Sequence, residues 1–294
     1  MSQPQAAILA PVPAHGRFII LGLRAGADTA SALGRVRSLR VDDRSVIGLG
    51  LPIVPDGGRA IPGLRPFPGL AGTGCVFPST QGAIFAFLGG TDAGDVLHRA
   101  RGVVTLLGDA FHVQEDVQAF LHAGGRDLSG YEDGTENPRG NDAVRAAIVS
   151  GHGEGLDGGS FVAAQRWVHD LGLIASMQAR ACDHLVGRSR ETNEELPDAP
   201  VSAHVKRAAQ ESFEPTAFMV RRSMPCGDVT EPGLFFVAYG ATLDAYERVL
   251  RRMAGHDDGI TDGLLRFTRA VSGGYYFCPP VRDGGLDLRA MAER

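Results

Sequence analysis

Short apolar runs alternate with longer amphipathic stretches along the chain, which is the pattern of strands followed by helices. Four apolar runs have the length and composition of strands, and they cover residues 18–23, 82–89, 161–167 and 233–240. A stretch with helical periodicity follows each run, over residues 29–39, 91–100, 171–182 and 242–253. The pattern predicts a mixed α+β protein.

The spacing of these strand–helix pairs indicates a duplicated unit. The runs at 82 and 233 are 151 residues apart (233 − 82), and those at 18 and 161 are 143 apart (161 − 18). A nearly constant offset favours duplication over the alternative, a chance similarity of amphipathic segments. Each half then reads strand, helix, strand, strand, helix, strand, which is a ferredoxin-like domain with a four-stranded antiparallel sheet. We expect two such domains, at residues 1–150 and 151–294.

Composition narrows the class of protein. Hydrophobic residues make up 44 % of the 294 residues and charged residues 21 %, which supports a sizeable core. The net charge of −5 gives no basic surplus for nucleic acid or an anionic membrane. No apolar run approaches the roughly 18 residues of a membrane span, and the N-terminus lacks a secretion signal. We therefore expect a cytoplasmic protein, in which four cysteines outside any CxxC pair are free thiols.

The run GYEDGTENP, residues 130–138, places the carboxylate of Asp133 in a turn. Backbone geometry fixes such a side chain, so it can point into a pocket as an acid–base group. An acidic surface turn is the alternative, because Asp-Gly and Asn-Pro are ordinary turn dipeptides. A calcium loop starting at Asp127 is excluded, since Tyr131 and Glu132 stand where an oxygen ligand and a glycine are needed.

The segment AHVKRA carries His204 directly after a polar stretch at 187–202 that we expect to be a long surface loop. No HExxH or HxxxH spacing exists, so a zinc site built from several histidines is not supported. A lone histidine can still hold a metal that arrives in a macrocycle, because haem needs one protein ligand. A solvated or hydrogen-bonded histidine is the alternative.

A strand-like run at 218–225 carries two arginines and a serine. Strand alternation places Arg221 and Ser223 on one face and Arg222 on the other. Arg221 can therefore point inward with Ser223 beside it, whereas an exposed strand end with solvated arginines is the alternative.

Taken together, the runs GYEDGTENP, AHVKRA and VRRSMPCG strongly resemble the dye-decolorizing haem peroxidases, in particular the bacterial B-class. The runs ILAPVPAHGRFIILGL, GLFFVAYG and FTRAVSGGYYFCPP are also similar to that family, so the resemblance covers most of the chain. It implies paired ferredoxin-like domains, with one haem b bound in the C-terminal domain. It also implies an often self-associating enzyme that reduces hydrogen peroxide and oxidises dyes or phenols by one-electron steps.

The resemblance also assigns roles to residues. By position in these motifs, Asp133 is the distal carboxylate, Arg221 the distal arginine and His204 the proximal ligand of the haem iron. Ser223 stands where the family carries a small polar residue, and it would help to orient peroxide. Five further residues are implied at the cofactor: Arg188 near a propionate, and Gly134, Thr135, Glu136 and Phe236 around the pocket.

One position departs from the family. Members usually carry an acid that is hydrogen-bonded to the proximal histidine, and Arg266 stands where we expect that acid. Asp262 is the candidate replacement, and otherwise a backbone carbonyl must accept the Nδ1 proton. A competing interpretation is a haem carrier without turnover, which would need neither Asp133 nor Arg221. Five aromatic residues are candidate electron relays, although core packing is the favoured interpretation: Trp167, Tyr239, Tyr246, Tyr275 and Tyr276.

Overall fold

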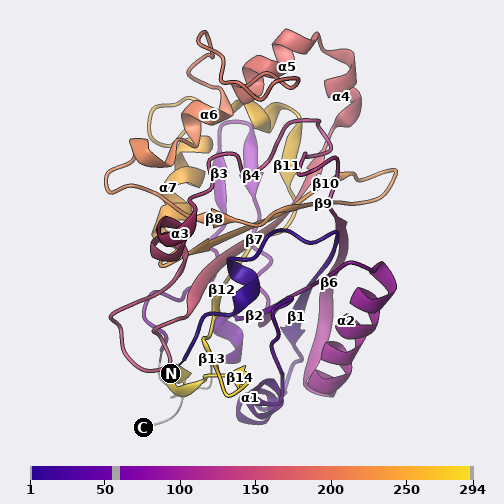
Figure 1. Ribbon diagram of the computed structural model, residues 1–294, viewed down its shortest axis with the longest axis vertical. Coiled ribbons are helices and arrows are strands. Elements are labelled where there is room, and N and C mark those ends of the chain that lie inside the picture. Colours follow the sequence, from indigo (N-terminus) through magenta and orange to yellow (C-terminus); the bar gives the residue numbers. More distant parts are fainter. Residues whose placement is uncertain (1, 55–59, 292–294) are drawn as a thin grey trace.

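The computed structural model describes residues 2–54 and 60–291. Its first half is a four-stranded antiparallel sheet in the order β2-β5-β1-β6 (Figure 1). The strands are β1 (His15–Leu23), β2 (Ser45–Leu49), β5 (Ile84–Gly90) and β6 (Phe111–Phe120). Helices α1 (Thr29–Arg37) and α2 (Ala93–Leu107) connect β1 to β2 and β5 to β6. This is the ferredoxin-like arrangement that the sequence predicts.

The second half repeats the arrangement around two central strands, β7 (Ser160–His169) and β10 (Gly233–Gly240). Both edge strands come in two pieces: β8 (Val220–Arg221) and β9 (Met224–Cys226) pair with β10, and β11 (Thr268–Ala270) and β12 (Gly274–Cys278) pair with β7. The helices are α4 (Leu171–Ser176), α5 (Ala179–Val186), α6 (His204–Arg207) and α7 (Asp244–Met253). The predicted duplication and the predicted α+β fold are both confirmed.

The two sheets join at both edges, because β2 pairs with β12 and β6 with β9. Their inner faces pack against each other, and Phe18 of β1 stacks on Phe235 of β10 with ring centroids 4.2 Å apart. Along β1, Phe18 and Ile20 belong to this central layer, whereas Ile19 and Leu21 pack with the buried residues of α1 and α2. The same alternation on β7 and β10 leaves their outer face for α7 and for the site described below.

Two predicted elements are broken in the structure. The helix predicted over 171–182 ends at Ser176 and restarts at Ala179, because the backbone is extended at Met177 and Gln178. The strand predicted over 218–225 is interrupted between β8 and β9. The second piece, β9, contains Pro225, which cannot donate to a ladder, and β9 pairs with β6 only at Cys226.

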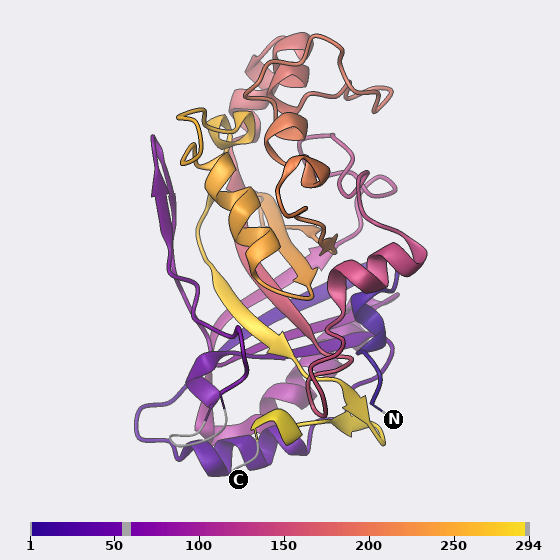
Figure 2. The same cartoon turned by 90° about the vertical axis from the view of Figure 1, so that its left-hand side faces the viewer.

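The segment between the halves packs on the second half. It contains an irregular loop and α3 (Gly140–Ala147), which contacts β8 and β10. The hairpin of β3 (Leu70–Gly72) and β4 (Cys75–Phe77) belongs to the first half in sequence but lies along the second half, where β4 contacts β11 (Figure 2). A short hairpin of β13 (Val281–Arg282) and β14 (Gly285–Leu286) follows β12. The domain boundary at 150 therefore stays a prediction, and its outer limits, 1 and 294, lie outside the described residues.

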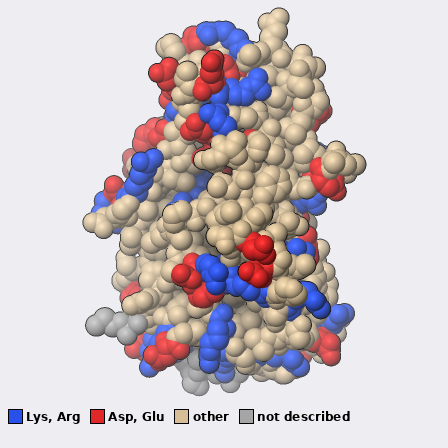
Figure 3. All heavy atoms as spheres, turned by 45° about the vertical axis from the view of Figure 1, so that its right-hand side comes forward, with Lys and Arg blue, Asp and Glu red and all other residues tan. Residues whose placement is uncertain are grey.

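The surface offers no broad basic face in the view of Figure 3, where Lys and Arg are interspersed with Asp and Glu. Within 2–54 and 60–291, no helix is long and apolar enough to cross a membrane. All four cysteines are free thiols, as predicted, and three of them are buried: Cys182, Cys226 and Cys278.

Candidate functional site

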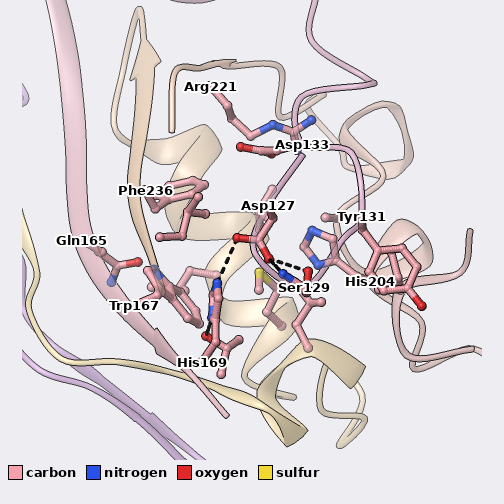
Figure 4. A pocket seen from close by; sticks show the side chains of 18 of the residues that line it. Asp127, Ser129, Tyr131, Asp133, Gln165, Trp167, His169, His204, Arg221 and Phe236 are labelled. Carbon is pink, nitrogen blue, oxygen red and sulfur yellow. Dashed lines mark hydrogen bonds and ion pairs between the residues drawn. The ribbon is translucent and has the colours of Figure 1, made fainter. Parts of the chain in front are cut away.

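A cavity of about 1040 Å³, counted out to its opening, lies between the second sheet and α7 (Figure 4). Its walls are mostly apolar and come from rigid elements: Trp167 of β7, Leu234 and Phe236 of β10, and Tyr246, Val249, Leu250 and Met253 of α7. Most of the polar side chains that line it come from loops and from the ends of elements, whereas Gln165 comes from the middle of β7. An apolar enclosure with a few convergent polar groups is the usual form of a cofactor site.

His204, the first residue of α6, lines this cavity and is fixed by a buried carboxylate. Its Nδ1 donates to Oδ2 of Asp262 at 2.8 Å, and the Asp262 side chain is fully buried. The other oxygen of Asp262 accepts from the backbone N–H of Leu264 at 2.8 Å, so the carboxylate cannot turn away. Nε2 is thus the nitrogen of His204 that remains free to act in the cavity.

The partner of His204 is the candidate replacement named from the sequence. Arg266, where we expect the family's acid, is exposed, while Asp262 lies four residues earlier at the start of a short 3₁₀ helix. The weaker alternative, a backbone carbonyl, is not what the ring contacts. A carboxylate acceptor increases the electron-donating strength of an imidazole ligand.

Arg221 and Asp133 line the same cavity (Figure 4). The backbone N–H of Arg221 donates to Oδ1 of Asn137 at 2.8 Å, and Nδ2 of Asn137 donates to the Arg221 carbonyl at 3.0 Å. Asn137 belongs to the turn of Asp133, and Gly134 makes that turn possible with a φ of +75°. The two candidate catalytic groups are therefore tied together through the backbone, and Asp133 is exposed at the open part of the cavity.

Of the other predicted site residues, Phe236 lines the cavity and the rest are not among its described lining residues. Arg188 donates to Glu136 at 2.5 Å and to the Asn193 carbonyl at 2.9 Å. Thr135 accepts from the Asn193 amide at 3.1 Å, so these residues form one polar loop cluster. The Ser223 hydroxyl is buried and accepts from the Val237 backbone N–H at 3.4 Å. The predicted roles of Arg188, Gly134, Thr135, Glu136 and Ser223 stay predictions.

The sequence reasoning missed a second acid–histidine pair in the cavity. Oδ1 of Asp127 accepts from Nε2 of His169 at 3.0 Å, and the two side chains are 13 % and 5 % exposed. Oδ2 of Asp127 accepts from both the backbone N–H and the hydroxyl of Ser129. Nδ1 of His169 shares a hydrogen bond of 2.7 Å with the hydroxyl of Thr268. This network fixes the start of the loop that carries Asp133 to the ends of β7 and β11 (Figure 4).

Electrostatics explain how Asp127 tolerates its position. Burial alone would raise its pKa, but the hydrogen bond and charge of His169, with the two bonds from Ser129, outweigh burial and hold the pKa below its ordinary value. Farther along the same loop, the Tyr131 hydroxyl donates to Asp183 of α5 at 2.7 Å. The loop of Asp133 is thus anchored by buried side chains before and within the turn.

We expect Asp127→Asn to lower the free energy of unfolding at pH 7 by about 1–3 kcal/mol, the usual cost of weakening a buried, charge-assisted hydrogen bond. A carboxylate with a depressed folded-state pKa stabilises fully above its unfolded value, near 3.9, and loses that contribution as pH falls through the folded value. The difference between wild type and Asp127→Asn should therefore shrink as the pH falls below about 4. Urea unfolding at several pH values measures it.

The matched control is Asp283→Asn, which removes the same charge from a side chain that is 90 % exposed. It should leave the unfolding free energy within about 0.5 kcal/mol of wild type at every pH. An equally small effect of Asp127→Asn would show that the buried pair does not anchor the loop.

Solved structures share this architecture. The dye-decolorizing protein from V. cholerae matches with a TM-score of 0.83 and 28 % identity, over 93 % of this chain and 96 % of that chain. A Rhodococcus jostii RHA1 DypB variant in complex with heme matches with a TM-score of 0.85 and 27 % identity, over 94 % and 96 % of the two chains. The paired sheets and the cavity of the second half thus define a protein with the fold of the DyP-type peroxidases.

Sequence comparison gives the same family. The family model described as "Dyp-type peroxidase, C-terminal" matches residues 124–283. The dye-decolorizing peroxidase of Mycobacterium tuberculosis is 32 % identical over 74 % of this chain and 67 % of its own length. That of Brevibacterium linens is 30 % identical over 94 % of this chain and 80 % of its own length. The chain belongs to the DyP-type peroxidase family.

Proposed function

We propose that this protein is a haem-dependent peroxidase of the B-class, which reduces hydrogen peroxide and oxidises bulky aromatic donors such as dyes or phenols in one-electron steps. The observation that carries the proposal is the hydrogen-bonded pair of His204 and Asp262 in an apolar cavity that also holds Arg221 and Asp133. The relatives named above are dye-decolorizing peroxidases, and one of the solved structures is in complex with heme. A cytoplasmic location and self-association stay predictions.

The residues of the cavity fit a haem group. Apolar walls suit a macrocycle, and the free Nε2 of His204 suits its iron. Among the described residues, no three His, Cys, Asp or Glu side chains gather to hold a metal ion, so iron would have to arrive with its own ligands. Nε of Arg221 and both amide atoms of Gln165 are buried without a hydrogen-bond partner among the described residues, so the cavity also offers polar atoms to a ligand or water. We propose haem b, one per chain, with His204 as its ligand.

When bound, haem would supply a redox-active iron that reacts with peroxide and would hold the oxidising equivalents that pass to the donor. Asp133 would accept a proton from one oxygen of peroxide and deliver it to the leaving oxygen. Arg221 would offset the negative charge that develops on that leaving oxygen, as a cation fixed in advance. The Asp262 carboxylate would hold Nδ1 of His204 and keep Nε2 directed at the cavity.

Purified protein loaded with haem should show a one-to-one Soret absorption and should bleach an anthraquinone dye only when peroxide is added. An equal concentration of free haem serves as the reference for background bleaching. One-to-one haem binding with bleaching no faster than this reference would support the haem-carrier interpretation, and absence of stoichiometric haem binding would contradict both.

A further inference from the structure

A second cavity lies on the other side of the backbone segment that carries Arg221. It is enclosed by residues 7–13 near the N-terminus and by strands β1, β5, β9 and β10, and it measures about 580 Å³ out to its opening. Its walls include Phe18, Phe87 and Met224, which are all buried and apolar. None of its described lining residues lines the cavity of His204, so the two cavities are separate.

Arg222 lines this second cavity, whereas its neighbour Arg221 lines the cavity of His204. Its Nη1 donates to the Arg221 carbonyl at 3.1 Å and its Nη2 to the Leu9 carbonyl at 3.0 Å. Its Nε is buried without a hydrogen-bond partner among the described residues, and no carboxylate of those residues lies within 4.0 Å of the guanidinium. Burial accordingly lowers the pKa of Arg222.

A half-buried cation that is satisfied only by neutral carbonyls is costly, because its charge has lost part of its water without gaining an anion. Tyr239 lines the same cavity, and no hydrogen bond of its hydroxyl is found among the described residues. Tyr239 is 2 % exposed and lies close enough to Arg222 for the charge of the arginine to act on its pKa. One cavity with apolar walls is therefore lined by two residues that carry hydrogen-bond donors, Arg222 and Tyr239.

We propose that this cavity binds a small organic carboxylate, held by the guanidinium of Arg222 and the hydroxyl of Tyr239, with its apolar part against Phe18, Phe87 and Met224. A planar carboxylate matches the donor geometry of arginine. The apolar walls favour a short hydrocarbon tail over a fully hydrated anion such as phosphate. Asp43 and Arg44, both exposed at the cavity, form an ion pair at 3.8 Å and so add no net charge to it.

Calorimetric titration of the haem-loaded protein with acetate, propionate and butyrate, at fixed pH and ionic strength, tests the proposal. We expect saturable one-to-one binding that tightens about three- to fourfold with each added CH₂, as expected for burial of a methylene group. The Soret absorption should not change, since the ligand occupies the separate cavity. No saturable binding, or equal heats with chloride and phosphate, would overturn the proposal.

Variants locate the ligand. Arg222→Met should weaken butyrate binding at least about tenfold, and Tyr239→Phe, which removes one hydroxyl, should weaken it several-fold. Arg251→Met on the exposed face of α7 is the matched control and should bind like wild type. Arg221→Leu should also bind butyrate like wild type, and a loss of binding in that variant would show that the ligand occupies the His204 cavity.

If Arg222→Met does not fold, Tyr239→Phe provides the test, because an unchanged affinity for butyrate in that variant contradicts the proposed site. Binding measured on haem-free protein separates this result from the peroxidase proposal.

Discussion

Replacing Arg221 with leucine should slow the reaction of the haem-loaded protein with hydrogen peroxide by about 100- to 1,000-fold, the usual loss when one prearranged charge-stabilising group is removed. The side chain of Arg221 lines the cavity, and its Nε has no hydrogen-bond partner among the described residues. Its backbone, in contrast, is held by Asn137 on both sides. Leucine should therefore remove the charge without releasing the strand, and the haem content should stay at the wild-type level.

Stopped-flow mixing with peroxide, followed at the Soret band, measures this rate.

Asp133→Asn should slow the same step by about 100- to 10,000-fold, because the amide keeps the shape of the side chain but cannot accept the proton. Arg251→Leu on exposed α7 is the matched control and should react like wild type. The haem-carrier interpretation predicts that both Arg221→Leu and Asp133→Asn react as fast as wild type. That result would remove the proposed distal chemistry.

The fold could be predicted because its signals are local and repeated. The run at 233–240 coincides with β10, and the run at 161–167 lies inside β7. Both are central strands buried on two faces, so a continuous apolar run marks them. The breaks at Met177 and between β8 and β9 could not be predicted in the same way. They arise where an element adapts to the loops and edges that it packs against, which the periodicity of the element itself does not record.

The site shows the same division between local and long-range information. Asp133, His204 and Arg221 lie in short motifs, and the structure brings all three to one cavity. The pair of Asp127 and His169 spans 42 residues, and no local pattern connects a loop carboxylate with the last residue of a strand. The Asp-x-Ser order at 127–129 is a turn signal that could have pointed to a fixed carboxylate, but not to its partner.

Loop residues were the hardest to place from motifs alone. Arg188 follows α5 in a motif that resembles the family, yet its guanidinium contacts Glu136 and the Asn193 carbonyl. Ser223 lies in the break between β8 and β9, so the regular alternation that put it beside Arg221 does not hold at that point. The orientation of both side chains depends on how the loops pack against neighbouring elements, which strand periodicity cannot determine.

Replacing His204 with alanine should lower the affinity of the protein for haem by at least about 100-fold. The other described histidine of the cavity, His169, has both ring nitrogens in hydrogen bonds, to Asp127 and Thr268, and so offers no free nitrogen in its place. Purified His204→Ala should therefore contain little haem, and its Soret band should shift when haem is added in excess. The ratio of haem to protein after gel filtration measures retention. His98→Ala, at an exposed position on α2, is the matched control and should retain haem like wild type.

Asp262→Asn separates the contribution of the Asp262 charge from that of the His204 ring. The amide can still accept from Nδ1 of His204, so haem should be retained better than in His204→Ala, with affinity about 10- to 100-fold below wild type. A neutral acceptor polarises the Nδ1–H bond less than a carboxylate does, so the imidazole donates less electron density to the iron. The iron reduction potential should therefore rise. Imidazole added to His204→Gly should restore the Soret band, since it can occupy the space beside Asp262. Full haem retention with an unchanged spectrum in both His204 variants would show that another residue ligates the iron.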